Sequence, residues 1–183
     1  VDGILSMLAQ DETYRLDHHD DLRAAGGMKV DVREVEAGET FSIGDVTISV
    51  HATDHRPVAP TVGFRIEHEG VVAALAGDTI PCEGLYDMCK DADVYVQTVL
   101  REDLVRTFAP LVPTGDRFLD ILDYHSTVQQ AGQTAAKCNV KTLLLTHFVP
   151  AIQPGQEEEW RAMAAENFSG EIVVGPDLTF VEK

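Results

Sequence analysis

Basic residues are scarce in this chain of 183 residues. Lysine and arginine together number 14, against 31 aspartates and glutamates, so the net charge is −17 and the pI is near 4.6. Binding to phosphate backbones depends on lysine and arginine. This balance therefore argues against broad, charge-driven binding of nucleic acids, and we expect no DNA partner. The acidic excess is typical of a soluble surface, with metal capture as a second interpretation.

Long apolar runs and paired cysteines are missing as well. No stretch approaches ~18 consecutive apolar residues, which argues against a membrane span. The first residues contain no basic segment followed by an apolar run, so we expect no signal peptide. Cys82, Cys89 and Cys138 give an odd count without a CxxC motif. Neither a disulfide framework nor a cysteine zinc site is expected, and a reduced, cytoplasmic setting fits best.

The usual signatures of a covalent nucleophile or a phosphate-binding loop do not occur. There is no GxSxG motif, no cysteine stands beside a histidine, and neither GxGxxG nor GxxxxGK[ST] is present. A metal-activated water is therefore the best nucleophile that the sequence offers.

What is present is the pattern of one globular domain, with 44% hydrophobic and 25% charged residues. The first third reads as antiparallel, since a glycine turn at Gly70 joins two strands into a hairpin. Strands are predicted at residues 28–36, 45–50, 61–69 and 71–77. Residues 51–60, with two prolines, read as a loop, and the AAGG of 24–27 as a turn.

The remaining two thirds alternate between helix and strand. Helices are predicted at residues 82–92, 126–138 and 157–168, the second with Ser126 as its N-cap. Strands are predicted at residues 93–99, 141–147, 171–175 and 178–182. Antiparallel strands followed by βα units predict a mixed α/β sheet covered by helices.

Two apolar strands are each followed by a metal-ligating residue. The strand 71–77 runs into Asp78, and the strand 141–147 ends at Thr146 and His147. Ligand sites in α/β sheets favour the carboxyl ends of strands, and a carboxylate with an imidazole suits a borderline metal such as zinc. In isolation, Asp78 could equally be a turn residue and His147 a satisfied core histidine.

Further histidines stand near these strands. His51 and His55 belong to the proline-containing segment 51–60, and His125 directly precedes the predicted helix at Ser126. Each can also be read as an exposed or capping histidine. His18 and His19 lie in an aspartate-rich stretch, which indicates a solvated face or the start of a helix, and His68 is expected at an exposed turn.

Four motifs in order resemble a known family. DHRPVAPTVGFRIE, LAGDT, DYHSTVQQAGQTAA and LLLTHF are similar to the histidine, aspartate, "HST" and last-histidine motifs of ribonuclease Z-like members of the metallo-β-lactamase superfamily. MLAQDETYRLDHHDDL is similar to a segment that precedes them. The resemblance implies an αββα sandwich, here apparently lacking its N-terminal part, as one partial domain over residues 1–183.

The resemblance also implies a site with two zinc ions. His55 would bind the first zinc, Asp78 would bridge both, and His147 would bind the second. His125 would lie beside the scissile phosphate as a proton donor or transition-state stabiliser.

Three departures from the family pattern stand out. The HxHxDH motif, which supplies further zinc ligands, is absent. The family's "HEAT" residues, which support the "HST" histidine, are replaced by residues 97–100, QTVL. The stretch from Phe64 to Asp78 reads as a tight hairpin with no room for a tRNA-gripping arm.

The sequence therefore predicts a zinc-dependent hydrolase of the ribonuclease Z-like phosphodiesterase type, with the tRNA 3′-processing endonuclease as the nearest named activity. Alternatives are a non-catalytic or partial chain that serves for binding, or a lactonase- or sulfatase-like hydrolase of the same superfamily. Expected partners are a small ester or phosphodiester, with RNA as a further candidate, and by analogy a second copy in a homodimer. A cytoplasmic location is expected.

Overall fold

The computed structural model describes residues 2–18, 30–175 and 177–182. The chain divides into two units, residues 1–35 and residues 36–183. The prediction of one partial domain over residues 1–183 stays a prediction.

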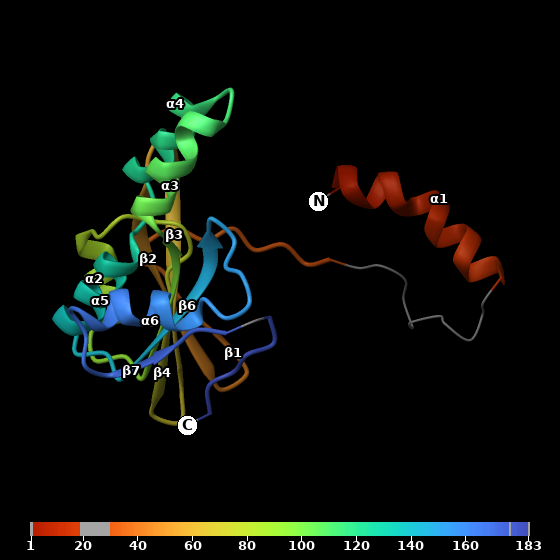
Figure 1. The fold of residues 1–183 in the computed structure, drawn as a ribbon. Coiled ribbons are helices and arrows are strands. Elements are labelled where there is room, and N and C mark those ends of the chain that lie inside the picture. The colour runs from red at the N-terminus through yellow and green to blue at the C-terminus, as the bar shows by residue number, and fades with distance from the viewer. Residues whose placement is uncertain (1, 19–29, 176, 183) are drawn as a thin grey trace. The chain divides into compact units, whose positions relative to one another are not determined.

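The first unit contains helix α1 (Asp2–His18), which has no buried residue (Figure 1). Its side chains contact each other one helical turn apart: Arg15 pairs with Asp11, and the His18 ring packs on Tyr14. No helix was predicted here from the sequence. The predicted strand 28–36 is wrong for residues 30–36, which form no strand and pair with none among the described residues. The predicted turn at 24–27 lies outside the described residues.

The second unit is built on one seven-stranded sheet in chain order. The strands are β1 (Thr40–Ile43), β2 (Val46–His55), β3 (Val58–His68), β4 (Val71–Leu75), β5 (Val94–Leu100), β6 (Thr142–Val149) and β7 (Glu171–Val173). Strands β1 to β4 pair antiparallel, and β4 to β7 pair parallel. The predicted mixed α/β sheet is confirmed.

Helices follow the parallel strands. They are α2 (Glu83–Cys89), α3 (Glu102–Phe108), α4 (Gly115–Asp120), α5 (Val128–Lys137) and α6 (Glu157–Ala165), with short 3₁₀ turns η2 (Ala109–Leu111) and η3 (Ile121–Asp123). The helices within 102–123 were not predicted. Thr127, and not Ser126, caps α5: its hydroxyl accepts from the Gln130 backbone N–H, and the Gln130 side chain accepts from the Thr127 backbone N–H.

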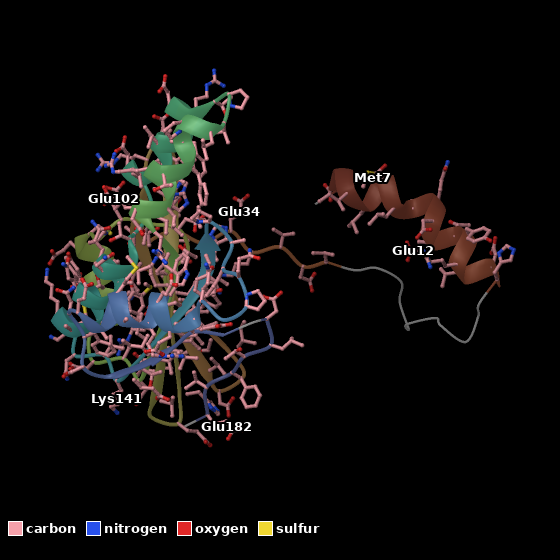
Figure 2. All side chains as sticks on the ribbon, in the orientation of Figure 1. Met7, Glu12, Glu34, Glu102, Lys141 and Glu182 are labelled. Carbon is pink, nitrogen blue, oxygen red and sulfur yellow. The ribbon has the colours of Figure 1, made fainter. Side chains whose placement is uncertain are left out.

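The hydrophobic core lies between the sheet and helices α2, α5 and α6 (Figure 1). Alternate residues of the parallel strands point into it, such as Tyr95 and Leu143, and the same core cluster contains the fully buried Trp160. Phe148 packs edge-on against the Trp160 indole, with ring centroids 5.0 Å apart. Charged residues such as Glu102 and Lys141 stay on the surface of this unit (Figure 2).

The opposite face of the sheet has a different character. Ala74 is fully buried, whereas the next residue along β4, Leu75, is 38% exposed, and Val71 is 39% exposed. Ile43 on β1 is also exposed. Among the described residues, therefore, one face of the sheet carries the helices and the other keeps apolar side chains in contact with solvent.

Two further predictions about strands are wrong. Residues 51–60 are not a loop: β2 continues to His55 and β3 starts at Val58. The prolines are tolerated because the register shifts between Thr53 and His55, so that Pro60 falls at a bulge. Residues 178–182 form no strand, and Leu178 and Phe180 are largely exposed because β7 is the last strand of the described sheet.

Candidate metal centre

The ends of the strands gather the predicted site residues at one edge of the sheet. Asp78 follows β4 through Gly77, whose φ of +67° is natural for a glycine. His55 is the last residue of β2, and His125 precedes α5. An isolated parallel β-bridge between Leu100 and Thr127 connects the segment that contains His125 to the end of β5.

His147 is directed to the site by a bulge in β6. Thr146 pairs with Thr98, and Val149 pairs with Leu100, so β6 has one residue more than β5 between these pairs. His147 takes up this extra residue with a φ of +48°, a region that non-glycine residues rarely occupy. Bulges change the direction of a side chain beside functional sites, and here the imidazole turns toward Asp78.

The Asp78 carboxylate is the centre of the arrangement. His125 Nε2 lies 3.6 Å from its Oδ2, and His147 Nδ1 lies 3.8 Å from its Oδ1. His55, Asp78 and His125 each offer a ligand atom, and these three atoms all lie within 4.8 Å of one another. The His55 and His125 rings meet edge to face, with centroids 5.0 Å apart.

The tautomer of His125 follows from its other hydrogen bond. Nδ1 lies 3.0 Å from the backbone carbonyl oxygen of Ile121. A carbonyl can only accept, so Nδ1 carries the proton and donates it. Nε2 then faces the Asp78 carboxylate either with a lone pair, as a metal ligand would, or with a second proton, as a general acid would.

Two buried polar atoms at this site, His55 Nε2 and Asp78 Oδ1, have no hydrogen-bond partner within the part of the chain that the structure describes. A buried polar atom without a partner costs about 1–3 kcal/mol, and most such atoms in proteins are satisfied. Imidazole nitrogens and a carboxylate are the donors that zinc prefers outside cysteine sites. The residues present therefore fit a divalent cation.

Tyr124 is a member of the site that the sequence did not single out. Its ring lies 4.9 Å from the His55 ring and 4.8 Å from the His125 ring, measured between centroids. Its position next to His125 in the chain was the available signal. The ring packs against both imidazoles and restricts their rotation.

Gln97 and Thr98 have a role that the sequence did not predict. The Gln97 amide donates to the carbonyl oxygen of Gly77 at 3.2 Å, and the Thr98 hydroxyl donates to the same oxygen at 2.9 Å. Gln97 is fully buried and in turn accepts from the Tyr95 hydroxyl at 2.5 Å. These residues therefore hold the peptide group that precedes Asp78.

The other histidines lie elsewhere. His51 hydrogen-bonds to Ser49 at 3.1 Å on β2, and burial lowers the pKa of its imidazole. His68 pairs with Asp45 at 3.1 Å, which lowers the pKa of that carboxyl group. His18 contacts Tyr14 within α1, and His19 lies outside the described residues.

The cysteines are not candidates for a nucleophile. All three are free, and Cys89 and Cys138 are buried. Burial raises the pKa of both thiols, which keeps them protonated near neutral pH. The sequence-based exclusion of a covalent cysteine is consistent with this environment.

Comparison with known families decides the class. The profile of the Beta-lactamase superfamily domain matches residues 2–148. The chain belongs to this superfamily. Its relatives within the superfamily carry a more specific name. The chain is 49% identical over 182 residues to ribonuclease Z of Mycobacterium tuberculosis (strain H37Ra) and 48% identical to ribonuclease Z of Mycobacterium avium (strain 104). The predicted ribonuclease Z-like membership of the metallo-β-lactamase superfamily is confirmed.

These matches cover the whole chain but only part of the relatives. The chain spans 64% of the M. tuberculosis protein and 62% of the M. avium protein. Among solved structures, the metallo-β-lactamase fold protein YhfI of Bacillus subtilis matches with a TM-score of 0.60 at 20% identity, over 87% of this chain and 58% of that one. The short form of human tRNase Z matches with a TM-score of 0.50 at 22% identity, over 78% and 44% of the two chains. The predicted fold class is confirmed.

Proposed function

We propose that this chain carries part of the metal centre of a zinc-dependent hydrolase that cleaves phosphodiester bonds. One observation carries the proposal: the Asp78 carboxylate has His125 beside one oxygen and His147 beside the other, with His55 completing a set of ligand atoms. A carboxylate flanked on both oxygens suits a bridging ligand. The names of the ribonuclease Z relatives support the phosphodiester class of substrate.

In this proposal His55, Asp78 and His147 hold the metal. Their chemistry, two imidazoles around a carboxylate, favours zinc over a hard cation such as magnesium. A divalent cation in such a site lowers the pKa of a water that it binds and neutralises charge on the attacked group. These three protein ligands would leave room for further ligands and for substrate.

His125 acts on a proton rather than on the metal in this proposal. Its Nδ1–H is committed to the Ile121 carbonyl oxygen, so Nε2, which lies 3.6 Å from Asp78 Oδ2, is the nitrogen left to exchange a proton. A second proton on Nε2 would be positioned for the leaving oxygen of a phosphodiester. A positioned general acid of this kind contributes ~10²–10⁴-fold to rate.

A cavity of about 590 Å³ lies next to His147. Its walls include Leu144, Phe148 and Ile152, with Glu157 among its polar groups. The apolar walls of this cavity beside the candidate metal centre would accept the body of a small ester, while its acidic groups Glu157 and Asp177 would disfavour a polyanion. RNA remains a candidate substrate through the names of the relatives.

The short hairpin between β3 and β4, which leaves no room for an RNA-gripping arm, also favours small substrates. β3 and β4 are joined by Glu69 and Gly70, both with positive φ, which is the geometry of a two-residue hairpin turn. We therefore expect small phosphodiesters to be cleaved with a higher kcat/KM than precursor tRNA. Efficient 3′ cleavage of precursor tRNA that exceeds this rate would overturn the preference for small substrates.

A second candidate is a chain that binds without catalysis. It is favoured by the small ligand set: with His55, Asp78 and His147 shared between two ions, each ion would have two protein ligands, whereas catalytic zinc usually has about three. We accordingly expect the 183-residue chain alone to bind zinc weakly and to be a poor hydrolase.

The deciding experiment is a calorimetric zinc titration of the 183-residue chain, with hydrolysis of bis(p-nitrophenyl) phosphate followed in parallel. Zinc binding with slow but metal-dependent turnover supports the hydrolase. If zinc binds but no hydrolysis is seen, either in the isolated chain or in a full-length relative that contains it, the result supports the second candidate, a chain that binds without catalysis. The Asp78→Ala variant serves as the control for both readouts.

Location and assembly stay within the proposal. Among the described residues, no helix is long and apolar enough to cross a membrane. The three free thiols are compatible with a reducing, cytoplasmic location. The exposed apolar face around Val71 and Leu75 would suit a second copy, and sedimentation of the purified chain tests this homodimer.

A further inference from the structure

Thr79 is the residue immediately after Asp78, and its side chain is fully buried. The backbone N–H of Asp54 donates to its hydroxyl oxygen at 2.9 Å. The hydroxyl itself lies 2.8 Å from the carbonyl oxygen of Ile80 and 3.2 Å from that of Asp54, and can donate to either. Ile80 N–H adds a further bond to the Asp54 carbonyl at 3.0 Å.

The backbone of Thr79 makes a contact with a third segment. The Ser126 hydroxyl donates to the Thr79 carbonyl oxygen at 2.7 Å, and Ser126 is almost completely buried. This explains why Ser126 does not cap helix α5, the role that the sequence suggested. The Ser126 carbonyl oxygen accepts from the Leu100 backbone N–H at 3.0 Å, which anchors the same segment to β5.

These bonds connect three segments that are far apart in the sequence. Asp54 precedes His55, Thr79 follows Asp78, and Ser126 follows His125. Each hydrogen bond is therefore one residue away from a side chain of the candidate metal centre. The ligand atoms of His55, Asp78 and His125 lie within 4.8 Å of one another, and the two buried hydroxyls bond the segments that carry them.

We propose that Thr79 and Ser126 are positioning residues that set the geometry of the His55–Asp78–His125 cluster. The proposal rests on the proposed metal centre, because it gives a reason for holding these three side chains at fixed distances. Thr79 sets the position of His55 relative to Asp78 through the Asp54 backbone. Ser126 sets the position of His125 relative to Asp78 through the Thr79 carbonyl group. Hydrogen-bonded groups behind metal ligands commonly change metal affinity ~10–100-fold when they are removed.

The test uses the 183-residue chain, Co²⁺ as the probe metal and four variants. Thr79→Val keeps the shape and removes the hydroxyl, Thr79→Ser restores a hydroxyl, and Ser126→Ala removes the second bond. Thr142→Val is the matched control, because Thr142 is equally buried and its hydroxyl bonds to Glu171 at 2.9 Å, at the start of β6. Co²⁺ affinity is measured from the visible absorption, and the histidine rings are followed by long-range ¹H–¹⁵N NMR without metal.

We expect Thr79→Val to weaken Co²⁺ binding ~10–100-fold, with Thr79→Ser recovering most of the affinity and Thr142→Val leaving it unchanged. In the metal-free NMR spectra, Thr79→Val should shift the His55 ring signals most, and Ser126→Ala those of His125. A general loss of stability would not divide the effects between the two rings in this way.

The proposal is overturned if Thr79→Val and Thr142→Val change the ring signals and Co²⁺ affinity alike, or if neither Thr79→Val nor Ser126→Ala shifts His55 or His125. If Thr79→Val does not fold, Thr79→Ser and Ser126→Ala still decide, through the NMR spectra. If the parent chain binds no Co²⁺, the proposed metal centre fails, while the ring signals continue to test the positioning role.

Discussion

The helix-covered core and the edge of the same sheet where the strands end, the site of His55, Asp78 and His147, differ in how their side chains are packed and paired. In the core, Tyr95, Leu143 and Trp160 are fully buried in one hydrophobic cluster. At the edge, His55 Nε2 and Asp78 Oδ1 are buried without a hydrogen bond among the described residues, and His147 occupies a rare backbone conformation. Among the described residues, Trp160 Nε1 in the core also lacks a hydrogen-bond partner. The edge differs because its unpartnered atoms, an imidazole nitrogen and a carboxylate oxygen, are potential metal ligands beside a strained backbone, a combination typical of functional sites.

This contrast predicts that the two regions can be damaged separately. Changes in the core should lower the free energy of unfolding and leave the chemistry of the edge in place. Changes at the edge should remove metal and activity with little loss of stability. The following predictions run from the largest expected effect to the smallest.

Asp78→Ala should lower the metal content more than any other single change at the candidate metal centre. Asp78 faces both His125 and His147, so its loss affects every ion that the cluster could hold. Elemental analysis of the purified variant should show less metal than His55→Ala or His147→Ala, while its thermal midpoint stays near that of the parent. Equal metal content in Asp78→Ala and the parent would refute the bridging role.

Trp160→Ala should have the largest effect on stability. Trp160 is fully buried on α6 and contacts Phe148, and the Arg101 guanidinium lies 5.8 Å from the centroid of its ring. Truncating a buried tryptophan costs ~3–5 kcal/mol, which urea unfolding would measure. The fraction that remains folded should bind Co²⁺ as the parent does. Weaker binding by the folded fraction would mean that core and edge are coupled.

His125→Ala should lower turnover of a model phosphodiester by ~10²-fold, the low end of the range for a positioned acid, without loss of metal. The low end is expected because Gln97 and Thr98 hold the Gly77 carbonyl group, and no hydrogen bond from either to His125 is found among the described residues. Activity and metal content are measured on the same sample, in the full-length context. A parallel loss of both would identify His125 as a metal ligand instead.

Leu75→Ala should have the smallest effect, and it tests the two faces of the sheet. Leu75 is 38% exposed on the face without helices, whereas Leu145 is 2% exposed on the covered face. Leu145→Ala should cost ~2–5 kcal/mol, and Leu75→Ala less than ~1 kcal/mol in the isolated chain. An equal cost for both would show that a second copy covers the open face, and sedimentation would then reveal the dimer.

Much of the core could be predicted from the sequence, because apolar periodicity is a local property. The strands around Tyr95 and Leu143 and the helices at 126–138 and 157–168 were found within a few residues of their observed bounds. The strand predicted at 28–36 failed for residues 30–36, because alternation of side chains cannot show whether a partner strand exists. The helices within 102–123 were missed, because no motif in that stretch indicated a helix.

The sequence by itself determined the family and the identity of the candidate ligands, because His55, Asp78, His125 and His147 lie in four ordered motifs, two of them at the ends of predicted strands. Tertiary structure decided how these residues meet. The bulge that turns His147 toward Asp78, the packing of Tyr124 against two imidazoles, and the bonds from Thr79 to Asp54 and from Ser126 to Thr79 all join segments distant in the chain. Such contacts depend on strand register and on buried hydrogen bonds, which are set only when the sheet and its helices pack together.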